Sequence, residues 1–209
     1  MCGVPIARLV ALMEKLKGSQ IEQLWAAAER GDPQAQYALG GAYFNGNGVA
    51  RDAVQGAHWL LKAAEGGYAP AQCDLGVMCQ NGVGVDQSYG DALKWYRKAA
   101  EQGDALACHN LGSLHGKGFR DKRKRFLMRM RFARATTDFV EAYKWFTLAA
   151  KRGHARSLKD LSRLEWFMSA SQIARAHSLV QEFERVLSEA LETESDKKIV
   201  SDYATFNVA

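Results

Sequence analysis

The sequence predicts an all-α protein: an α-solenoid of stacked antiparallel helix pairs, forming a right-handed superhelix with a capping helix at each end. The first observation is a phrase that recurs as WLLKAAEGG, WYRKAAEQG and WFTLAAKRG, at residues 59–67, 95–103 and 145–153. The second is that apolar residues recur at helical intervals, whereas no strand-like alternation recurs from copy to copy. A single helix pair of this length cannot bury its apolar face, so neighbouring pairs must stack.

Each repeat is expected to begin with a helix that ends in a glycine-rich turn. Its three versions are AQYALGGAYFNGNGV, AQCDLGVMCQNGVGV and ACHNLGSLHGKGF, at residues 35–49, 71–85 and 107–119. In the first copy, residues three and four apart form one apolar face that we expect to be buried: Ala35, Ala38, Leu39 and Ala42. Glycine then closes the helix because it adopts the left-handed conformation without strain.

Glycine also recurs inside this first helix, at Gly40, Gly76 and Gly112. A glycine in a helix interior costs about 1 kcal/mol relative to alanine, so its recurrence at one position suggests a packing reason. We therefore expect two helices to cross closely at this position in each repeat.

The second helix of each repeat carries a tryptophan at a recurring position: Trp59, Trp95 and Trp145. A large aromatic side chain at a repeating interface buries much apolar area, so we expect these residues to pack and not to bind a ligand. Trp25 and Trp166 lie near the two ends of the repeat region, where we expect them to cover the exposed terminal faces.

The combined pattern, A-x-x-x-L-G-x-x-(Y)-x-x-G-x-G-V followed by A-x-x-W-(Y/F)-x-x-A-A-x-x-G, resembles that of the Sel-one-like repeat (SLR) family, relatives of the tetratricopeptide repeats. The resemblance covers about residues 21–167. Within this range we identify a partial copy, three main copies and a degenerate fourth copy that lacks the glycine.

The ends of the chain are expected to differ from the repeats. Residues 168–193 are similar to the capping helix that follows the last repeat in many bacterial members of the family. Ser169 and Gln172 are spaced to form a capping box at its start. We expect residues 1–20 to form an amphipathic helix and residues 194–209 to form a loose tail.

The resemblance implies a non-catalytic adaptor, in which the first helices line a concave groove that holds a partner protein or peptide. The implied groove positions lie opposite or beside the apolar face of these helices: Tyr37, Gly41, Phe44, Cys73, Val77, Gln80, His109 and Ser113. Exposed aromatic side chains at Tyr37 and Phe44 would make good anchors for a partner. The alternative is that both pack against the neighbouring helix.

A basic segment interrupts the third repeat. The distance from the glycine of the first helix to the tryptophan of the second is 19 residues in the first two repeats and 33 in the third, which places an insertion at about residues 117–136. Residues 117–134 contain nine basic residues and one acidic residue, so the rest of the chain has a net charge of −3. Four arginines of the segment are candidates for partner binding: Arg123, Arg125, Arg129 and Arg131.

The insertion segregates its side chains better as an extended chain than as a helix, because Phe126 and Met128 then lie on one side and Arg129 on the other. It is expected to be a strap laid on the solenoid or a mobile arm that orders on a partner. Such an arm can bind nucleic acid or acidic lipid, and binding of an anionic surface is therefore the alternative function. The net negative charge of the repeats disfavours that alternative.

Patterns for catalysis and metal binding are weak. No H-E-x-x-H, G-x-S-x-G or Walker motif occurs, and although some relatives are linked to β-lactam binding or hydrolysis, an enzyme is the least favoured function. Cys73 and Cys79 are six residues apart on one helix, too far for a disulfide or a shared zinc ion. We expect buried thiols, no metal and no cofactor. The absence of a long apolar stretch and of a secretory signal favours a cytoplasmic monomer.

Overall fold

The computed structural model describes residues 20–116 and 139–206, with side chains described up to residue 190. The predicted N-terminal helix over residues 1–20 and the insertion over residues 117–136, with its four candidate arginines, therefore lie outside the described residues, except for Gln20 at one edge. Every regular element of the described ranges is a helix, as predicted. The chain divides into two compact units, Met1–Ala107 and Cys108–Ala209.

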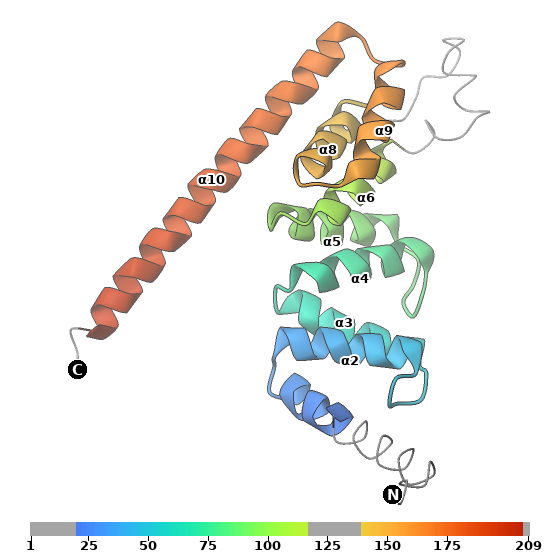
Figure 1. Ribbon diagram of the computed structural model, residues 1–209, viewed down its shortest axis with the longest axis vertical. Coiled ribbons are helices and arrows are strands. Elements are labelled where there is room, and N and C mark those ends of the chain that lie inside the picture. The colour runs from blue at the N-terminus through green and yellow to red at the C-terminus, as the bar shows by residue number, and fades with distance from the viewer. Residues whose placement is uncertain (1–19, 117–138, 207–209) are drawn as a thin grey trace, which may run out of the picture. The chain divides into compact units, whose positions relative to one another are not determined.

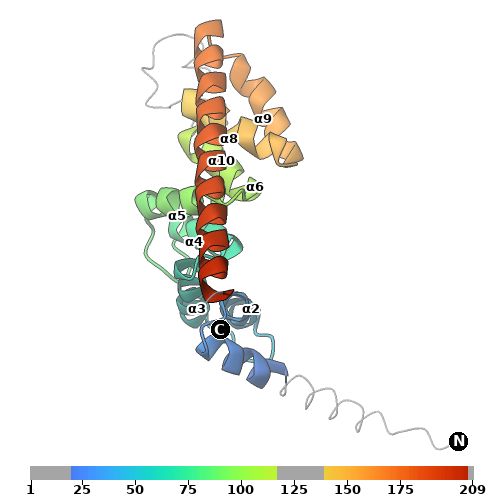
Figure 2. The same ribbon diagram turned by 90° about the vertical axis from the view of Figure 1, so that its left-hand side faces the viewer.

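The first unit consists of helices that pack against their neighbours in chain order. After a helical stretch over residues 20–29, its complete helices are α2 (Pro33–Asn45), α3 (Ala53–Glu65), α4 (Ala69–Asn81) and α5 (Tyr89–Glu101). Figures 1 and 2 show α2 to α5 stacked one upon the next, and contacts join each helix of this series to the following one. This stacking confirms the predicted solenoid of helix pairs. Helix α6 (Ala105–His115) contains the boundary between the units.

The recurring glycines lie where two helices cross closely, as predicted. A Cβ atom on Gly76 would lie 2.6 Å from two ring carbons of Tyr96, and one on Gly112 would lie 2.7 Å from the ring of Phe146. At Gly40 the nearest atom is Cγ of Leu60, at 3.0 Å. A side chain of the second helix, a ring in the second and third repeats and a leucine in the first, therefore occupies the space that a larger residue would need in the first helix.

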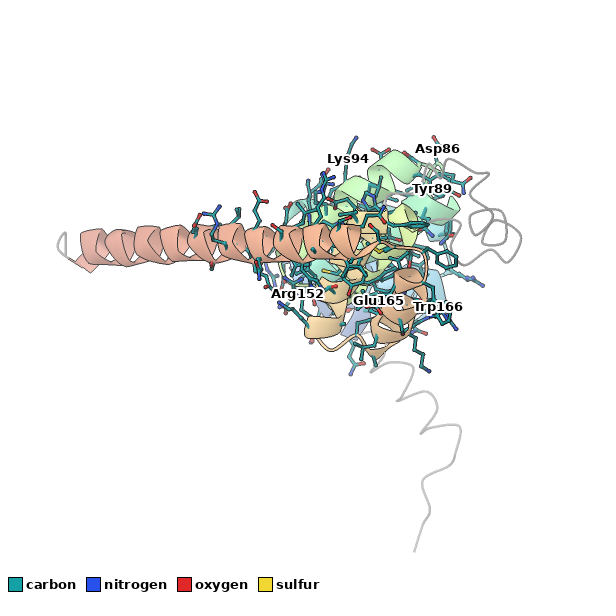
Figure 3. The ribbon with its side chains drawn as sticks, turned by 90° about the horizontal axis from the view of Figure 1, so that it is seen from above. Asp86, Tyr89, Lys94, Arg152, Glu165 and Trp166 are labelled. Carbon is teal, nitrogen blue, oxygen red and sulfur yellow. The ribbon has the colours of Figure 1, made fainter. Side chains whose placement is uncertain are left out.

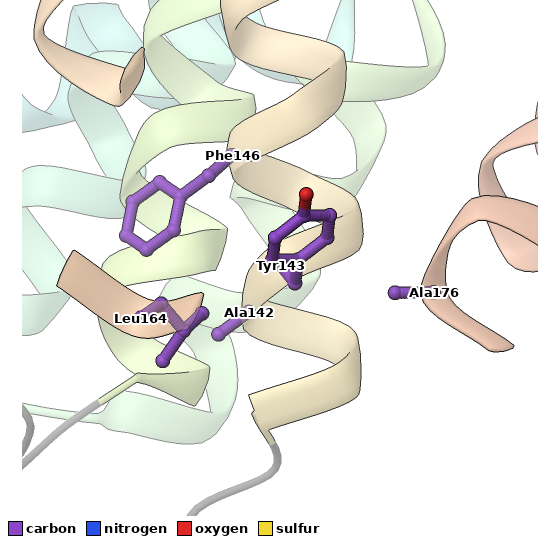
Figure 4. Close-up of a cluster of buried hydrophobic side chains, with 5 residues drawn as sticks. All are labelled: Ala142, Tyr143, Phe146, Leu164 and Ala176. Carbon is purple, nitrogen blue, oxygen red and sulfur yellow. The ribbon is translucent and has the colours of Figure 1, made fainter. Parts of the chain in front are cut away.

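The second unit is formed by the end of α6 with α8 (Phe139–Lys151), α9 (Ala155–Glu165) and α10 (Ala170–Phe206). Its core gathers buried side chains from α8, α9 and α10 (Figure 4): Ala142, Tyr143, Phe146, Leu164 and Ala176. Trp145 of α8 also contacts Phe183 of α10, with ring centroids 5.2 Å apart. The start of α10 is therefore fixed on α8.

The predicted capping box at the start of α10 is present in both directions. The backbone N–H of Ser169 donates to Oε1 of Gln172 at 2.8 Å, and the backbone N–H of Gln172 donates to Oγ of Ser169 at 3.2 Å. The helix then runs past the expected end at residue 193 to Phe206. No glycine or proline occurs within α10, so the sequence contains no strong stop before that point.

The tryptophans divide into packed and exposed residues. Trp59 and Trp145 are buried, which confirms their predicted role in packing, and Trp25 contacts the rings of Tyr43 and Trp59. Trp166, at the end of α9, is 88% exposed (Figure 3), so the prediction that it covers a terminal face is wrong. The reason is its position: it follows buried Leu164 by two residues, which is about 200° around a helix.

Candidate partner-binding surface

The predicted groove residues do not all reach the surface. Cys73 and His109 are 2% and 6% exposed, so they have almost no area to offer a partner, and the expectation for these two needs correction. The other six predicted residues are half-buried: Tyr37, Gly41, Phe44, Val77, Gln80 and Ser113. The helix face that carries Cys73 and His109 is thus an interior face.

The accessible face of the first helices agrees with the prediction at Gly41 and Val77, but at its other predicted positions it lies one residue further along the chain. We call it the first-helix stripe; its members in the first unit are Gln34, Ala38, Gly41, Asn45, Pro70, Asp74, Val77 and Asn81. Their spacing of four, three and four keeps them on one side of α2 and of α4. Ala38, expected in the core, is exposed here. The sequence held a signal for this, because the equivalent position one repeat later is Asp74, and a charge is incompatible with a repeating apolar core.

Two of the predicted groove residues serve packing instead of a groove. The ring of Phe44 lies over Gly56 of α3, where a Cβ atom would meet it at 2.8 Å. Oε1 of Gln80 accepts a hydrogen bond from the hydroxyl of Tyr96 at 3.2 Å. For Phe44 the structure thus shows the alternative, a contact with the neighbouring helix.

The chemistry of the stripe is simple. Asp74 is the only charged residue of α2 and α4, and no basic residue lies on either helix. Ala38 and Gly41 leave the backbone accessible, and a Cβ atom on Gly41 would have no neighbour within 4 Å. Amide side chains at Asn45 and Asn81 can both donate and accept hydrogen bonds. A small, amide-bearing surface with one negative charge suits a peptide backbone better than a catalytic reaction.

A hollow of about 550 Å³ continues the stripe at the end of α2. It is lined by Gln20, Ile21, Leu24, Ala38, Gly41, Ala42, Asn45, Gly46, Asn47 and Gly48. Three stripe residues, Ala38, Gly41 and Asn45, are thus shared between the flat face of the helix and the hollow. The hollow adds concave surface to the stripe, as partner binding requires.

Tyr37, Asp74 and Tyr68 form a cluster between the first helices of two adjacent repeats. The hydroxyl of Tyr37 donates to Oδ2 of Asp74 at 2.9 Å, and the rings of Tyr37 and Tyr68 meet edge to face with centroids 5.2 Å apart. Burial raises the pKa of the Asp74 carboxyl, and the hydrogen bond from Tyr37 opposes that rise. Sequence reasoning named Tyr37 alone, because nothing in the spacing indicates that the other two meet it.

Tyr68 occupies a position where the flanking repeats have a capping aspartate. Asp32 accepts from the backbone N–H of Gln34 at 2.9 Å at the start of α2, and Asp104 accepts from that of Ala107 at 2.6 Å at the start of α6. Tyr68, the N-cap residue of α4, makes no such side-chain hydrogen bond. Losing an N-cap costs about 1 kcal/mol, so the second repeat has exchanged helix stability for an aromatic contact.

The second unit contains a buried polar cluster that resembles a catalytic arrangement. Oγ of Ser157 lies 2.9 Å from Nδ1 of both His109 and His154, whose ring centroids are 4.2 Å apart. Ser157 is fully buried, however, so its hydroxyl cannot reach a substrate. In the parts of the chain that the structure describes, no group of histidine, cysteine and acidic residues could hold a metal ion. The cluster therefore serves to satisfy buried polar atoms.

The ionisation of Tyr37 and Tyr143 is expected to make the free energy of unfolding depend on pH in the alkaline range. Burial, then a hydrogen bond to a carboxylate, raises the pKa of Tyr37 and of Tyr143 to about 12; the carboxylates are Asp74 and Glu165. An unfolded tyrosine ionises near pH 10, so the folded state keeps a proton that the unfolded state has lost. We therefore expect the free energy of unfolding to fall between pH 10 and 12. Urea unfolding at pH 9 and 11 measures this, and Tyr143→Phe should show a smaller fall than the wild type; an equal fall would contradict the assignment.

The repeat pattern can be compared with known families. A model of the Sel1 repeat matches residues 33–68, 69–104, 105–124 and 134–154. The chain belongs to the Sel1 repeat family. Sel1 repeat proteins are in general protein-interaction scaffolds and not catalysts. The gap between the last two matched ranges falls within the basic segment.

Solved structures of Sel1 repeat proteins resemble this chain. A Sel1 repeat protein from Oxalobacter formigenes is 31% identical with a TM-score of 0.54, over 68% of this chain and 97% of that chain. A protective antigen of uropathogenic Escherichia coli strains with an SLR fold is 25% identical with a TM-score of 0.47, over 83% of this chain and 42% of that chain. No curated protein matches the sequence. Among the described helices, none is long and apolar enough to cross a membrane.

Proposed function

We propose that this Sel1 repeat protein is a non-catalytic adaptor that binds a segment of a partner protein along the first-helix stripe. The observation that carries the proposal is that one continuous face of α2 and α4 is accessible while the residues beside it, such as Leu39 and Cys73, are buried. Of the predicted contacts, Tyr37, Gly41 and Val77 lie on or beside this face. The proposed setting is the cytoplasm, where a thiol such as Cys79 stays reduced.

The stripe suits an extended segment that is recognised mainly through its backbone. The small residues Ala38 and Gly41 allow a peptide to approach closely, and the hollow beside Asn45 gives space for a side chain. Ser113, half-buried on α6, is the counterpart of Gly41 and Val77 in the third repeat. A preformed helical surface of this kind loses little conformational entropy when a partner binds, which favours affinity.

The proposal is tested by blocking the stripe without disturbing the fold. Ala38→Arg adds a large side chain at an exposed position of α2, and Val54→Arg does the same on α3, where Val54 is 65% exposed. We expect partners captured by the wild type to be lost with Ala38→Arg and kept with Val54→Arg. Hydrogen exchange of the purified complex should then show protection over residues 34–45 and 70–81. Equal capture by both variants, or protection confined to α3 and α5, would refute the stripe as the binding surface.

A second candidate function rests on the basic segment at residues 117–134. Nine basic residues in eighteen are enough to bind nucleic acid or acidic lipid by phosphate contacts, with Arg123, Arg125, Arg129 and Arg131 among them. Binding of this kind weakens steeply with salt. Deletion of residues 119–134 separates the two functions: an adaptor that uses the stripe keeps its partners, whereas an anionic-surface binder loses them.

A further inference from the structure

We propose that Asp74, Tyr37 and Tyr68 form a receptor for a basic side chain, lysine or arginine, of the partner segment. This inference rests on the proposed adaptor function and adds the chemistry of the partner to it. Asp74 lies at the centre of the stripe in the second repeat, the hydroxyl of Tyr37 donates to it, and the ring of Tyr68 meets the ring of Tyr37. A carboxylate at the edge of an aromatic cluster can combine an ion pair with cation–π attraction.

Charge complementarity identifies the occupant. Residues 20–107 carry ten acidic and six basic side chains, a net charge of −4, and α2 and α4 contain none of the six basic ones. Within the described residues, no lysine, arginine or histidine lies within ion-pair distance of Asp74. The only charge of the stripe is therefore negative and half-buried, and a partner must bring the cation.

The carboxylate of Asp74 can accept further hydrogen bonds. A carboxylate has about four lone-pair sites, and the described part of the chain supplies one hydrogen bond, from the hydroxyl of Tyr37 to Oδ2. That bond fixes the orientation of the carboxylate without neutralising it. Burial and the negative charge of Asp104 raise the pKa of Asp74, and a bound cation would lower it. The site is thus oriented in advance for a charged hydrogen-bond donor.

The second repeat departs from its neighbours at these positions. The residues equivalent to Asp74 are Ala38 and Asn110, and those equivalent to Tyr68 are Asp32 and Asp104. The tyrosine removes a helix cap that both flanking repeats keep. His154, the N-cap residue of α9, also makes no capping hydrogen bond, but Tyr68 is the one that lies between two capped repeats and meets the ring of Tyr37. A local rule broken at a cost between two repeats that keep it is typical of a functional position.

The competing explanation is that the Tyr37–Asp74 hydrogen bond only ties two repeats together. The variant Asp74→Asn separates the two explanations. Its amide oxygen can still accept a hydrogen bond from the hydroxyl of Tyr37, but it carries no charge. A structural tie survives Asp74→Asn, whereas a cation receptor does not. Tyr68→Ser is the second variant, since serine restores a capping oxygen and removes the ring.

The test uses a phage-displayed library of random twelve-residue peptides, selected against the full chain. We expect the enriched peptides to share a lysine or arginine at one fixed position. Replacing that residue with norleucine or citrulline should raise the dissociation constant at least ten-fold, as should Asp74→Asn, and Tyr68→Ser should raise it several-fold. Asp86→Asn removes an exposed charge elsewhere and should change the dissociation constant less than two-fold.

The outcomes separate this inference from the proposed function. If peptides bind and are blocked by Ala38→Arg, yet share no basic residue or bind Asp74→Asn equally well, the receptor is overturned and the adaptor function stands. If no selected peptide is blocked by Ala38→Arg, the proposed stripe is overturned, and the receptor with it. The substitution within the peptide requires no protein variant, so the test holds even where a variant folds poorly.

Discussion

Replacing Gly76 with alanine is expected to lower the free energy of unfolding by about 2 kcal/mol. The added methyl group would lie 2.6 Å from Cδ1 and Cε1 of Tyr96, closer than carbon atoms can approach. The ring cannot move aside easily, because it is almost fully buried and its hydroxyl donates to Gln80. Helix propensity acts in the opposite direction, since alanine gains about 1 kcal/mol over glycine in a helix. The expected destabilisation is therefore the free-energy cost of the clash minus the gain in helix propensity.

Gly41→Ala is the matched control for Gly76→Ala. Gly41 is also in the interior of a first helix, but an alanine there would meet no atom within 4 Å. We expect it to raise the free energy of unfolding by about 0.5–1 kcal/mol, because only the propensity gain applies. Urea unfolding followed by far-UV circular dichroism measures both variants. If both were stabilising, the recurring glycine would not mark a close helix crossing.

The glycine position was predicted from the sequence, whereas the exposed face of the first helices was predicted only in part. Gly40, Gly76 and Gly112 recur against a clear energetic cost, so their packing role followed from the pattern. Gly41 and Val77 were named, but Tyr37 and Cys73 were named where Ala38 and Asp74 are the more exposed residues. A one-residue error is about 100° on a helix, and apolar or small residues such as Ala38 fit either face.

The Tyr37–Tyr68–Asp74 cluster was beyond sequence reasoning for a different reason. Aligning the repeats shows that Tyr68 stands where Asp32 and Asp104 stand, but not that its ring meets Tyr37. Side chains from the start of one helix and the middle of another meet only when the packing of the repeats is known. Departures from a repeat consensus were thus visible in the sequence, while their convergence on one point was not.

The start of α10 and the exposure of Trp166 show that local hydrogen bonds are easier to predict than packing between distant elements. The capping box at Ser169 depends only on neighbours in sequence, and it was predicted correctly. Whether Trp166 is covered depends on which face of α9 packs on the core, and that face is set by Leu164. Local hydrogen bonding was therefore more predictable than coverage by distant elements.

Phe146→Ala is expected to destabilise the second unit by about 3–5 kcal/mol, the largest effect of a single substitution that we foresee. Phe146 is fully buried, lies against Gly112 and contacts the ring of His109 at a centroid distance of 5.4 Å. Because Gly112 stands opposite and has no side chain, it cannot fill the space that the ring leaves, and His109 is held by its hydrogen bond with Ser157. The cavity would therefore persist, and its cost would add to the lost burial of the ring.

Trp166→Ala provides the control for Phe146→Ala, because it removes a larger ring from the same unit at a position that is 88% exposed. We expect its free energy of unfolding to stay within about 0.5 kcal/mol of the wild type. Thermal and urea unfolding of the full chain measure both. If Phe146→Ala were as mild as Trp166→Ala, the glycine-facing ring would not be the centre of the repeat core. Some other contact would then have to fix the angle at which the two helices of a repeat cross. That crossing also determines which face of the first helix, the stripe, is accessible.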